Sequence, residues 1–230
     1  MVKEEEKNNL WKRRYETFIR LYRGRSDVIA QQEEDGPYLP VEGEGFTFER
    51  FIDHVHLRQT YAIYNLDDLK RVHFGLFDID VFPRNQEWPR LLSGIEEKRK
   101  ETLRIMKVLL DMGLKRQQLL LEFPTVGFHL LLFFKDPVEA KWLKGFMQTV
   151  LDQCHLSPIP FYPKKVEENR WGDRVQLPLR INRNTSRRSN FIRDLECFDP
   201  EHYDPNPDFS ILDGIELIDR EWVDQWVRKE

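Results

Sequence analysis

Two aspartates stand at the end of an apolar run in the segment Val72-His-Phe-Gly-Leu-Phe-Asp78-Ile-Asp80. The run is typical of a β-strand, and side chains two residues apart on a strand project from the same face of a sheet. Two like charges placed side by side cost free energy unless a cation neutralises them. Mg2+ and Mn2+ accept carboxylate oxygens, water and substrate phosphate as ligands. Asp78 and Asp80 therefore predict a divalent-metal site for chemistry on phosphates, although a strand can also end in Asp because the chain turns there.

The elements that must position this pair follow it in the chain. Apolar side chains at helical spacing, Gly and Pro as stop and start signals, and short apolar runs divide the next hundred or so residues into helices and strands. We expect, in chain order, a helix at 94–112, a strand at 118–122, a strand at 127–134, a helix from Asp136-Pro137 to about Leu151, and a strand at 174–179.

This order of strand, helix, strand, strand, helix, strand is the split arrangement of ferredoxin-like and RNA-recognition-like folds. Its third strand lies antiparallel beside the first, so Gly127 and His129 should lie next to Asp78 and Asp80. Its fourth strand is also antiparallel to the first and should bring Asp173, at its start, to the same end of the sheet. We therefore expect an α/β protein of the α+β kind, with helical additions at both ends of this unit.

Three parts of the chain are expected. They are an N-terminal lobe at 1–70, a catalytic core at 71–200 and a C-terminal helical appendage at 201–230. Within the first part we expect a helix at 4–23, a mobile acidic loop at 31–46, and a helix and a strand within 47–70. The appendage carries Trp222 and Trp226 on one helical face, which can pack on the core or lead into a linker.

Two enzyme classes that also use an aspartate pair at a strand end fit this chain less well. Haloacid-dehalogenase phosphatases continue with Asp-x-Asp-x-Thr or Asp-x-Asp-x-Val and a glycine turn, whereas Val81-Phe-Pro-Arg84 follows here. Glycosyltransferases place the pair after a nucleotide-binding α/β half, and no such half precedes Asp78. Neither class explains the Gly-x-His sequence at residues 127–129.

The two motifs, in this order and spacing, resemble the catalytic core of the archaeo-eukaryotic primase superfamily. Its first motif, an apolar strand ending in Asp-x-Asp, is matched by Phe77-Asp-Ile-Asp80, and its second, a Gly- or Ser-x-His strand, by Gly127-Phe-His-Leu130. The segments 19–28 and 56–64 are similar to the N-terminal region of bacterial primase-polymerases from conflict systems and CRISPR-associated operons. The resemblance covers residues 18–185.

The resemblance implies a function and a role for each motif. Asp78 and Asp80 would be catalytic and would hold Mg2+ or Mn2+ for template-directed nucleotidyl transfer. His129 would bind the triphosphate, and Gly127 would let a phosphate approach the backbone closely. A lone histidine on an apolar strand is commonly a packed core residue, and this alternative stays open. The partners implied are a single-stranded nucleic-acid template, nucleoside triphosphates, and a helicase or other domain of a larger protein.

The chain departs from the family pattern at two places. Family members carry a third catalytic carboxylate shortly before a Phe/Tyr-Pro-Lys run, but Ile159-Pro-Phe161 in that position holds no acid. The third carboxylate is then Asp173, Glu167 or Glu168, or it is missing, and the expected sheet geometry favours Asp173. The turn before the histidine, residues 122–127, is also shorter and has one glycine fewer, so the triphosphate-binding turn can differ.

Positive charge is concentrated in one stretch. Residues 170–193 contain seven arginines and a single acid, Asp173. Arginine binds phosphate through two parallel hydrogen bonds, and neutralising phosphates supplies most of the sequence-independent affinity for nucleic acid. We assign Arg174 and Arg180 to the triphosphate. Template contacts are expected from Lys164, Lys165, Arg183, Arg187 and Arg188, for which a solvated surface is the alternative.

Composition limits the remaining possibilities. The net charge is −4, from 36 basic and 40 acidic residues, so a nucleic-acid surface must be a local patch. Cys154 and Cys197 lack zinc-site spacing and indicate a reducing cytoplasm. No run is long enough to span a membrane, and the N-terminus does not resemble a signal peptide. Three function classes remain: a primase-polymerase, a nucleic-acid-binding module of the same fold without turnover, and a metal-dependent phosphatase or nuclease.

Overall fold

The computed structural model describes residues 2–34, 36–84, 86–156, 158–166 and 171–227. Its helices are α1 (Val2–Leu21), α2 (Phe48–Val55), α3 (Trp88–Asp111), the 3-10 helix η1 (Arg116–Gln118), α4 (Ala140–Cys154), α5 (Ser210–Asp213) and α6 (Arg220–Val227). Its strands are β1 (Val28–Gln32), β2 (Tyr38–Glu42), β3 (Tyr61–Tyr64), β4 (Arg71–Asp80), β5 (Leu119–Phe123), β6 (Gly127–Glu139), β7 (Phe161–Tyr162), β8 (Arg174–Gln176), β9 (Ile181–Asn182), β10 (Arg187–Arg188) and β11 (Asn190–Ile192). The α+β class expected from the sequence is confirmed.

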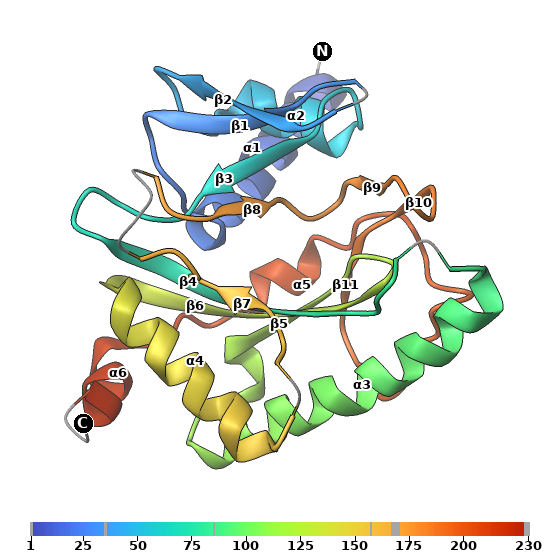
Figure 1. Cartoon of the computed structure of the whole chain (residues 1–230). Coiled ribbons are helices and arrows are strands. Elements are labelled where there is room, and N and C mark those ends of the chain that lie inside the picture. The colour runs from blue at the N-terminus through green and yellow to red at the C-terminus, as the bar shows by residue number, and fades with distance from the viewer. Residues whose placement is uncertain (1, 35, 85, 157, 167–170, 228–230) are drawn as a thin grey trace.

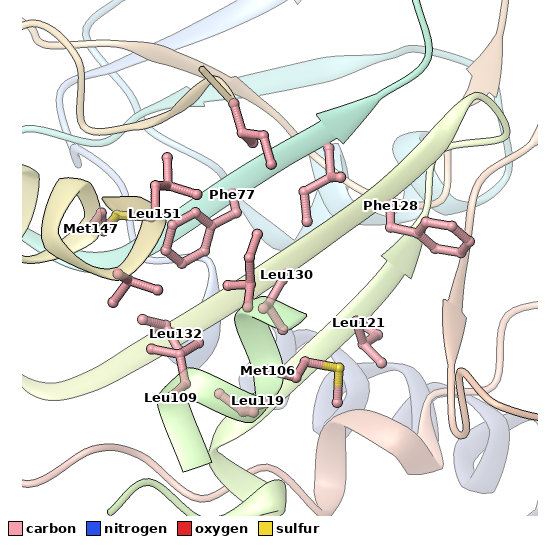
Figure 2. Packing of buried hydrophobic residues seen from close by; sticks show 14 of the residues in the cluster. Phe77, Met106, Leu109, Leu119, Leu121, Phe128, Leu130, Leu132, Met147 and Leu151 are labelled. Carbon is pink, nitrogen blue, oxygen red and sulfur yellow. The ribbon is translucent and has the colours of Figure 1, made fainter. Parts of the chain in front are cut away.

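A five-stranded antiparallel sheet in the order β11-β5-β6-β4-β7 forms the middle layer of the molecule. Helices α3 and α4 lie along one face of this sheet (Figure 1). Alternate side chains of the strands, including Phe77 and Leu130, point toward these helices and pack against Met106 and Met147 (Figure 2). Because successive side chains point to opposite faces, Asp78 lies on the face that α3 and α4 leave open.

The other face of the middle sheet carries a second core and a second sheet. The four strands of that sheet are ordered β2-β1-β3-β8 and lie above the middle sheet in Figure 1, with α1 and α2. Tyr22, directly after α1, packs edge-on against Phe133 of β6, with 5.4 Å between ring centroids. Val175 of β8 belongs to the same core. This layer is therefore built from the N-terminal part of the chain together with the much later segment that contains β8.

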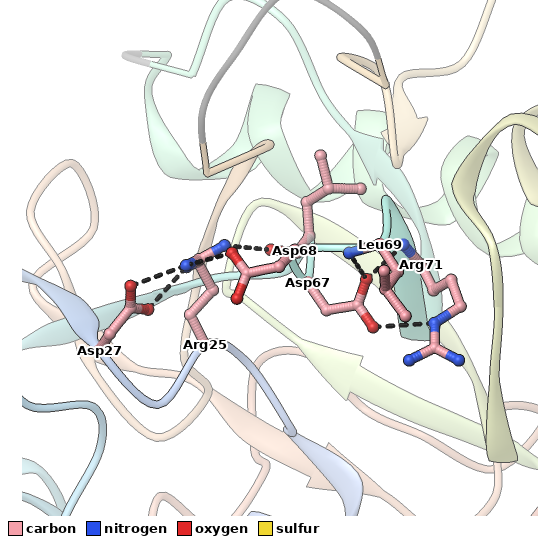
Figure 3. Close-up of polar contacts among 7 residues, drawn as sticks. Arg25, Asp27, Asp67, Asp68, Leu69 and Arg71 are labelled. Atoms are coloured by element: carbon pink, nitrogen blue, oxygen red, sulfur yellow. Dashed lines mark hydrogen bonds and ion pairs between the residues drawn. The ribbon is translucent and has the colours of Figure 1, made fainter.

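Polar contacts fix the connection between β3 and β4, through which the chain passes from the upper sheet to the middle sheet. Arg25 forms ion pairs of 2.7 Å with Asp27 and with Asp68. Asp67 accepts hydrogen bonds from the backbone of Leu69 and from both the backbone and the guanidinium of Arg71, as Figure 3 shows. These contacts hold the loop that leads into β4 and therefore fix where β4 begins.

The predicted strand and helix at the start of the catalytic unit are present. Helix α3 begins at Trp88, six residues before the predicted start, with Pro89 in its first turn, and Gly113 follows its end with a φ of +95°. The predicted neighbour relation of the first and third strands is confirmed, because β4 and β6 pair in antiparallel register. The predicted helix at 4–23 and the helix and strand within 47–70 correspond to α1, α2 and β3.

Three predictions about local structure are wrong. The helix expected to open at Asp136-Pro137 begins at Ala140, because β6 continues to Glu139 and pairs again with the start of β4 after an irregularity in register. Pro137 lies within that irregular stretch, where a missing N–H costs no ladder hydrogen bond. The expected mobile loop at 31–46 is instead a hairpin in which Tyr38 of β2 pairs with Gln32 of β1.

The third correction concerns the fourth strand. Residues 174–179 were expected beside the first strand, but β8 covers Arg174–Gln176 and pairs with β3 in the upper sheet. The strand that pairs with β4 on the side away from β6 is β7, where Phe161 lies opposite Phe77. The division of the chain into three parts remains a proposal.

The C-terminal helices pack on the rest of the molecule, as one of the two alternatives for the appendage predicts. Trp222 of α6 contacts Phe146 of α4 edge-on at 5.3 Å and donates a hydrogen bond to the carbonyl of Met112. Ile218, just before α6, forms a bridge with Phe134 of β6. Within the described ranges, no helix is both long and apolar enough to cross a lipid bilayer.

Candidate active site

The register of β4 and β6 brings the two sequence motifs together. Asp78 lies directly opposite His129, and Asp80 lies directly opposite Gly127. Among the described residues, Asp78, Asp80 and His129 form a group whose ligand atoms all lie within 4.8 Å of one another. The predicted adjacency is therefore confirmed, while the roles of these residues remain to be tested.

Both aspartates are removed from water. The side chains of Asp78 and Asp80 are 13% and 3% exposed, and the Oδ1 atom of each is buried without a hydrogen-bond partner among the described atoms. Burial and the negative charge of Asp78 raise the pKa of Asp80 to about 6. Burial also acts to raise the pKa of Asp78, but the positive charge of His129 close to it outweighs burial and lowers that pKa. A bound cation would satisfy these two buried oxygens, which lack hydrogen bonds among the described atoms.

A positive side chain that the sequence interpretation did not select already contacts the pair. The guanidinium of Arg84 lies 2.6 Å from Oδ2 of Asp80 and 3.9 Å from Oδ1 of Asp78. It also lies over the ring of Phe82, 4.8 Å from its centroid. Arg84 is 39% exposed, so the side chain can move into solvent when a divalent ion competes for the carboxylates. In the sequence, only its position four residues after Asp80 indicates that Arg84 could contact the pair.

His129 is held between two carboxylates. Its Nδ1 lies 2.8 Å from Oε2 of Glu122, which is opposite it on β5, and its Nε2 lies 3.6 Å from Oδ1 of Asp78 on β4. Burial acts to lower the pKa of His129, but the charges of Glu122 and Asp78 and the hydrogen bond with Glu122 outweigh burial and raise that pKa to about 10. His129 is therefore a buried histidine between two carboxylates rather than one packed among apolar side chains alone.

Glu122 was not selected from the sequence as a site residue. Its signal is an acid that interrupts the apolar run Leu119-Leu-Leu-Glu-Phe123. Its side chain is only 4% exposed, and a buried carboxylate requires a charged or hydrogen-bonding partner. The residue opposite it on β6 is His129, which supplies that partner.

A cavity of about 140 Å³ opens beside this group, between the two sheets. Asp78, Asp80 and His129 line it from the middle sheet, and Arg174 and Arg180 line it from the segment that contains β8. The structure therefore brings Arg174 and Arg180 to the predicted site, although β8 belongs to the other sheet. The remaining lining residues are Leu76, Arg84, Tyr162, Val175 and Gln176.

Asp173, the favoured third carboxylate, is engaged elsewhere. Its Oδ2 accepts hydrogen bonds from the backbone N–H of Lys164 at 2.5 Å and of Lys165 at 2.9 Å. Its own N–H donates to the side chain of Asn65. In this structure Asp173 fixes the backbone just after β7 and is not part of the group formed by Asp78, Asp80 and His129. Its alternatives Glu167 and Glu168 lie outside the described residues, as does Arg170.

The structure explains why residue 127 is a glycine, and the explanation differs from the predicted contact with phosphate. A Cβ atom built on it would lie 2.6 Å from the Cα of Asp80, 2.8 Å from the Oδ1 of Asp80 and closer still to the carbonyl oxygen of Ile79. Glycine is therefore required for β6 to approach β4 at the carboxylates. A close approach of phosphate to Gly127 remains a prediction.

The residues predicted to contact the template differ in how free they are. Lys164 and Lys165 are exposed, and the ammonium of Lys164 lies 4.4 Å from the ring centroid of Tyr162, beside the cavity. Arg183 is exposed but donates hydrogen bonds to the carbonyls of Glu33 and Glu34 in the hairpin turn after β1. Of this set, the two lysines have the side chains best placed to meet a strand at the cavity edge.

Arg187 and Arg188 have internal partners. The guanidinium of Arg188 donates to the carbonyls of Leu179 and Val55, and burial lowers its pKa. The guanidinium of Arg187 donates to the carbonyls of Pro200 and Glu201. Both arginines therefore hold loops together in this structure, and a template contact by either remains a prediction.

Comparison with known proteins adds one finding. A family model described as the archaeo-eukaryotic primase domain of the TOTE conflict system matches residues 42–225, which is more than three quarters of the chain. No curated protein matches the chain.

Proposed function

The chain belongs to the archaeo-eukaryotic primase domain family of TOTE conflict systems, and from this premise we propose that it is a primase-polymerase, a metal-dependent nucleotidyltransferase that makes or extends a DNA or RNA strand on a template. One observation carries the proposal. Asp78 and Asp80 are buried, each has one oxygen without a hydrogen bond from the described residues, and they face a cavity whose other walls carry three arginines and a histidine. Carboxylates beside fixed cations suit a metal ion and a nucleoside triphosphate together.

The metal site would be formed by Asp78 and Asp80. Their oxygens are the ligands that Mg2+ and Mn2+ prefer, and burial provides the free-energy reason for a cation to bind there. When bound, the metal would lower the pKa of the attacking 3′-hydroxyl and stabilise the charge of the leaving pyrophosphate.

The chain's own cations would hold the triphosphate. His129, kept protonated by Glu122 and Asp78, would donate to a phosphate oxygen, and Arg174 and Arg180 would bind from the opposite wall. We place a single-stranded template across Lys164 and Lys165 at the edge of the cavity. A helicase or another domain of a larger protein would supply any function beyond strand synthesis.

Primer extension tests the proposal. The wild-type chain should extend a labelled primer on a single-stranded template with Mg2+ or Mn2+ and deoxynucleotides or ribonucleotides, and the double variant Asp78→Ala, Asp80→Ala should not. The matched control replaces Asp199 and Glu201 with alanine, because these acids belong to the other described group of His and carboxylates and are exposed. Extension by the Asp78, Asp80 variant at the wild-type rate would reject the assignment.

One observation favours a second candidate, a nucleic-acid-binding module of the same fold without turnover. Among the described residues, the group beside the cavity contains two carboxylates and a histidine, and Asp173 is bonded to backbone instead. Pyrophosphate release on mixing with template, Mn2+ and nucleoside triphosphates separates the two candidates. Release of orthophosphate or shortening of the template would indicate a phosphatase or a nuclease.

The role of Asp173 has its own test. If Asp173 acts only by holding the backbone of Lys164 and Lys165, Asp173→Asn should retain more activity than Asp173→Ala, because an amide oxygen still accepts those hydrogen bonds. Equal, complete loss of activity with both variants would instead support a metal ligand.

A further inference from the structure

A second cavity adjoins Asp80 where β4 turns toward α3. Its volume is about 450 Å³, and Asp80, Phe82 and the first half of α3, including Arg90 and Lys98, line it. We propose that this cavity binds the 3′-terminal nucleotide of the strand being extended, with Phe82 stacking against its base. The inference rests on the proposed nucleotidyl transfer and adds the acceptor subsite to it.

The position of the cavity relative to Asp80 supports the inference. In phosphoryl and nucleotidyl transfer the attacking oxygen and the leaving group lie roughly in line on opposite sides of the phosphorus. Asp80 lines both cavities, whereas Asp78 and His129 line only the smaller one. A triphosphate in the smaller cavity would thus leave the second cavity, on the other side of Asp80, for the attacking hydroxyl.

The smaller cavity has an excess of positive charge, whereas the charges that line the larger cavity are balanced. Arg84, Arg174, Arg180 and His129 face only two carboxylates in the smaller cavity. In the larger cavity Arg90 and Lys98 are balanced by Asp80 and Glu97. An excess of positive charge suits a triphosphate, and a balanced site suits a nucleoside with a single phosphodiester.

Phe82 has the exposure and the rigid support expected of a stacking surface. It is 60% exposed, although Val81 before it is only 6% exposed. A Cβ on Gly94 of α3 would lie 2.7 Å from the side chain of Val81, so α3 packs closely against this residue and fixes the chain at Phe82. An exposed aromatic ring stacks on any base, which suits an acceptor of variable sequence.

Arg90 supplies a contact for the backbone of the acceptor strand. It is exposed, and within the described part of the chain no ion pair involves it. Lys98, about two turns further along the same helix, forms an ion pair of 2.8 Å with Glu101. Arg90 is therefore the better candidate for the terminal phosphodiester, with a salt-dependent contribution to affinity.

Variants of Phe82 test the inference. Phe82→Ala should raise the KM for a primed template about tenfold while the KM for the nucleotide stays within about twofold, because stacking on one base is lost. Phe82→Trp should restore the wild-type KM. The control is Leu69→Ala, which removes an exposed apolar side chain, 69% exposed, from the loop between β3 and β4. Equal melting temperatures of the variants ensure that folding is not the cause.

A binding measurement without nucleotide or metal separates this inference from the proposed function. Labelled duplex with a recessed 3′ end should bind wild type more tightly than the same template without a primer, and Phe82→Ala should remove the difference. Strand extension with unchanged KM and binding in Phe82→Ala would overturn the acceptor subsite and leave the proposed function standing. Preferential, Phe82-dependent binding of the recessed end by a chain that makes no product would retain the subsite and reject the activity.

Discussion

Replacing Asp80 with asparagine should stabilise the protein while abolishing its activity. Burial and the charge of Asp78 raise the pKa of Asp80 from 3.8 to about 6. An acid whose pKa is higher in the folded state than in the unfolded state lowers the stability as pH rises between the two values, and the whole cost is present above the folded value. The difference of about two pH units corresponds to roughly 3 kcal/mol.

The net gain is smaller than this figure because Arg84 loses its partner. That ion pair is short, at 2.6 Å, but the Arg84 side chain is 39% exposed, and solvent-screened pairs contribute about 1 kcal/mol or less. At pH 8 without metal we expect Asp80→Asn to gain about 2 kcal/mol, which is roughly 4–8 °C in melting temperature for a chain of this size. At pH 4 the difference should be small, because Asp80 is then protonated in the folded wild type.

Thermal unfolding at pH 8 and pH 4, first with a chelator and then with Mg2+, measures both effects. Mg2+ should raise the melting temperature of the wild type at pH 8 and leave that of Asp80→Asn nearly unchanged, since a ligand stabilises only the state that binds it. Asp199→Asn, at an exposed position, is the control and should behave as the wild type. A lower melting temperature of Asp80→Asn at pH 8, or an equal gain from Mg2+, would refute the reasoning.

Three further predictions concern the surroundings of the site. His54 is fully buried, its Nε2 donates to the carbonyl of Pro178 and its Nδ1 accepts from the N–H of Tyr61, and burial lowers its pKa to about 4. Between pH 6.5 and pH 4 the His54 ring therefore takes up a proton in the unfolded chain but not in the folded one, so the free energy of unfolding should fall by about 3 kcal/mol as the pH is lowered across that interval. Urea unfolding of His54→Gln should show a flatter pH dependence than that of the wild type. Gly127→Ala should lose roughly 2 kcal/mol of stability in the same assay, because its Cβ would meet the backbone of Ile79 and Asp80, which cannot move aside as a side chain can; an unchanged midpoint would contradict this. Glu122→Gln should raise the KM for nucleotide about tenfold, with template affinity unchanged, because His129 loses its charged partner at 2.8 Å; a loss of template affinity alone would contradict it.

The sequence predicted the centre of the site because strand geometry sufficed there. Alternation along a strand places Asp78 and Asp80 on one face, and the split arrangement of strands and helices places the third strand antiparallel beside the first. The register that follows puts His129 opposite Asp78, as observed. The partner of His129 on its other side is Glu122, which ends the strand predicted at 118–122, but the sequence gives no register between that strand and the one that carries His129.

The fourth strand was misplaced because its signal is weak. β7 contains only Phe161 and Tyr162, with Pro160 and Pro163 on either side, so it has too few residues for any alternation to be visible. The longer run at 174–179 has the stronger strand pattern and therefore predicts the fourth strand. Pairing of a strand with β3, more than a hundred residues earlier, depends on the packing of the whole chain and has no local pattern.

The segment that contains β8 nevertheless supplies Arg174 and Arg180 to the cavity, so the site depends on both sheets. The segment 173–180 crosses above the middle sheet, where Asn65 holds Asp173 near its start and His54 holds Pro178 toward its end. Neither Asn65 nor His54 lines the small cavity, but both fix the backbone from which the two arginines extend. The upper sheet and α2 therefore support the backbone that carries the two arginines, and residues that do not line the cavity set the geometry of the proposed triphosphate site.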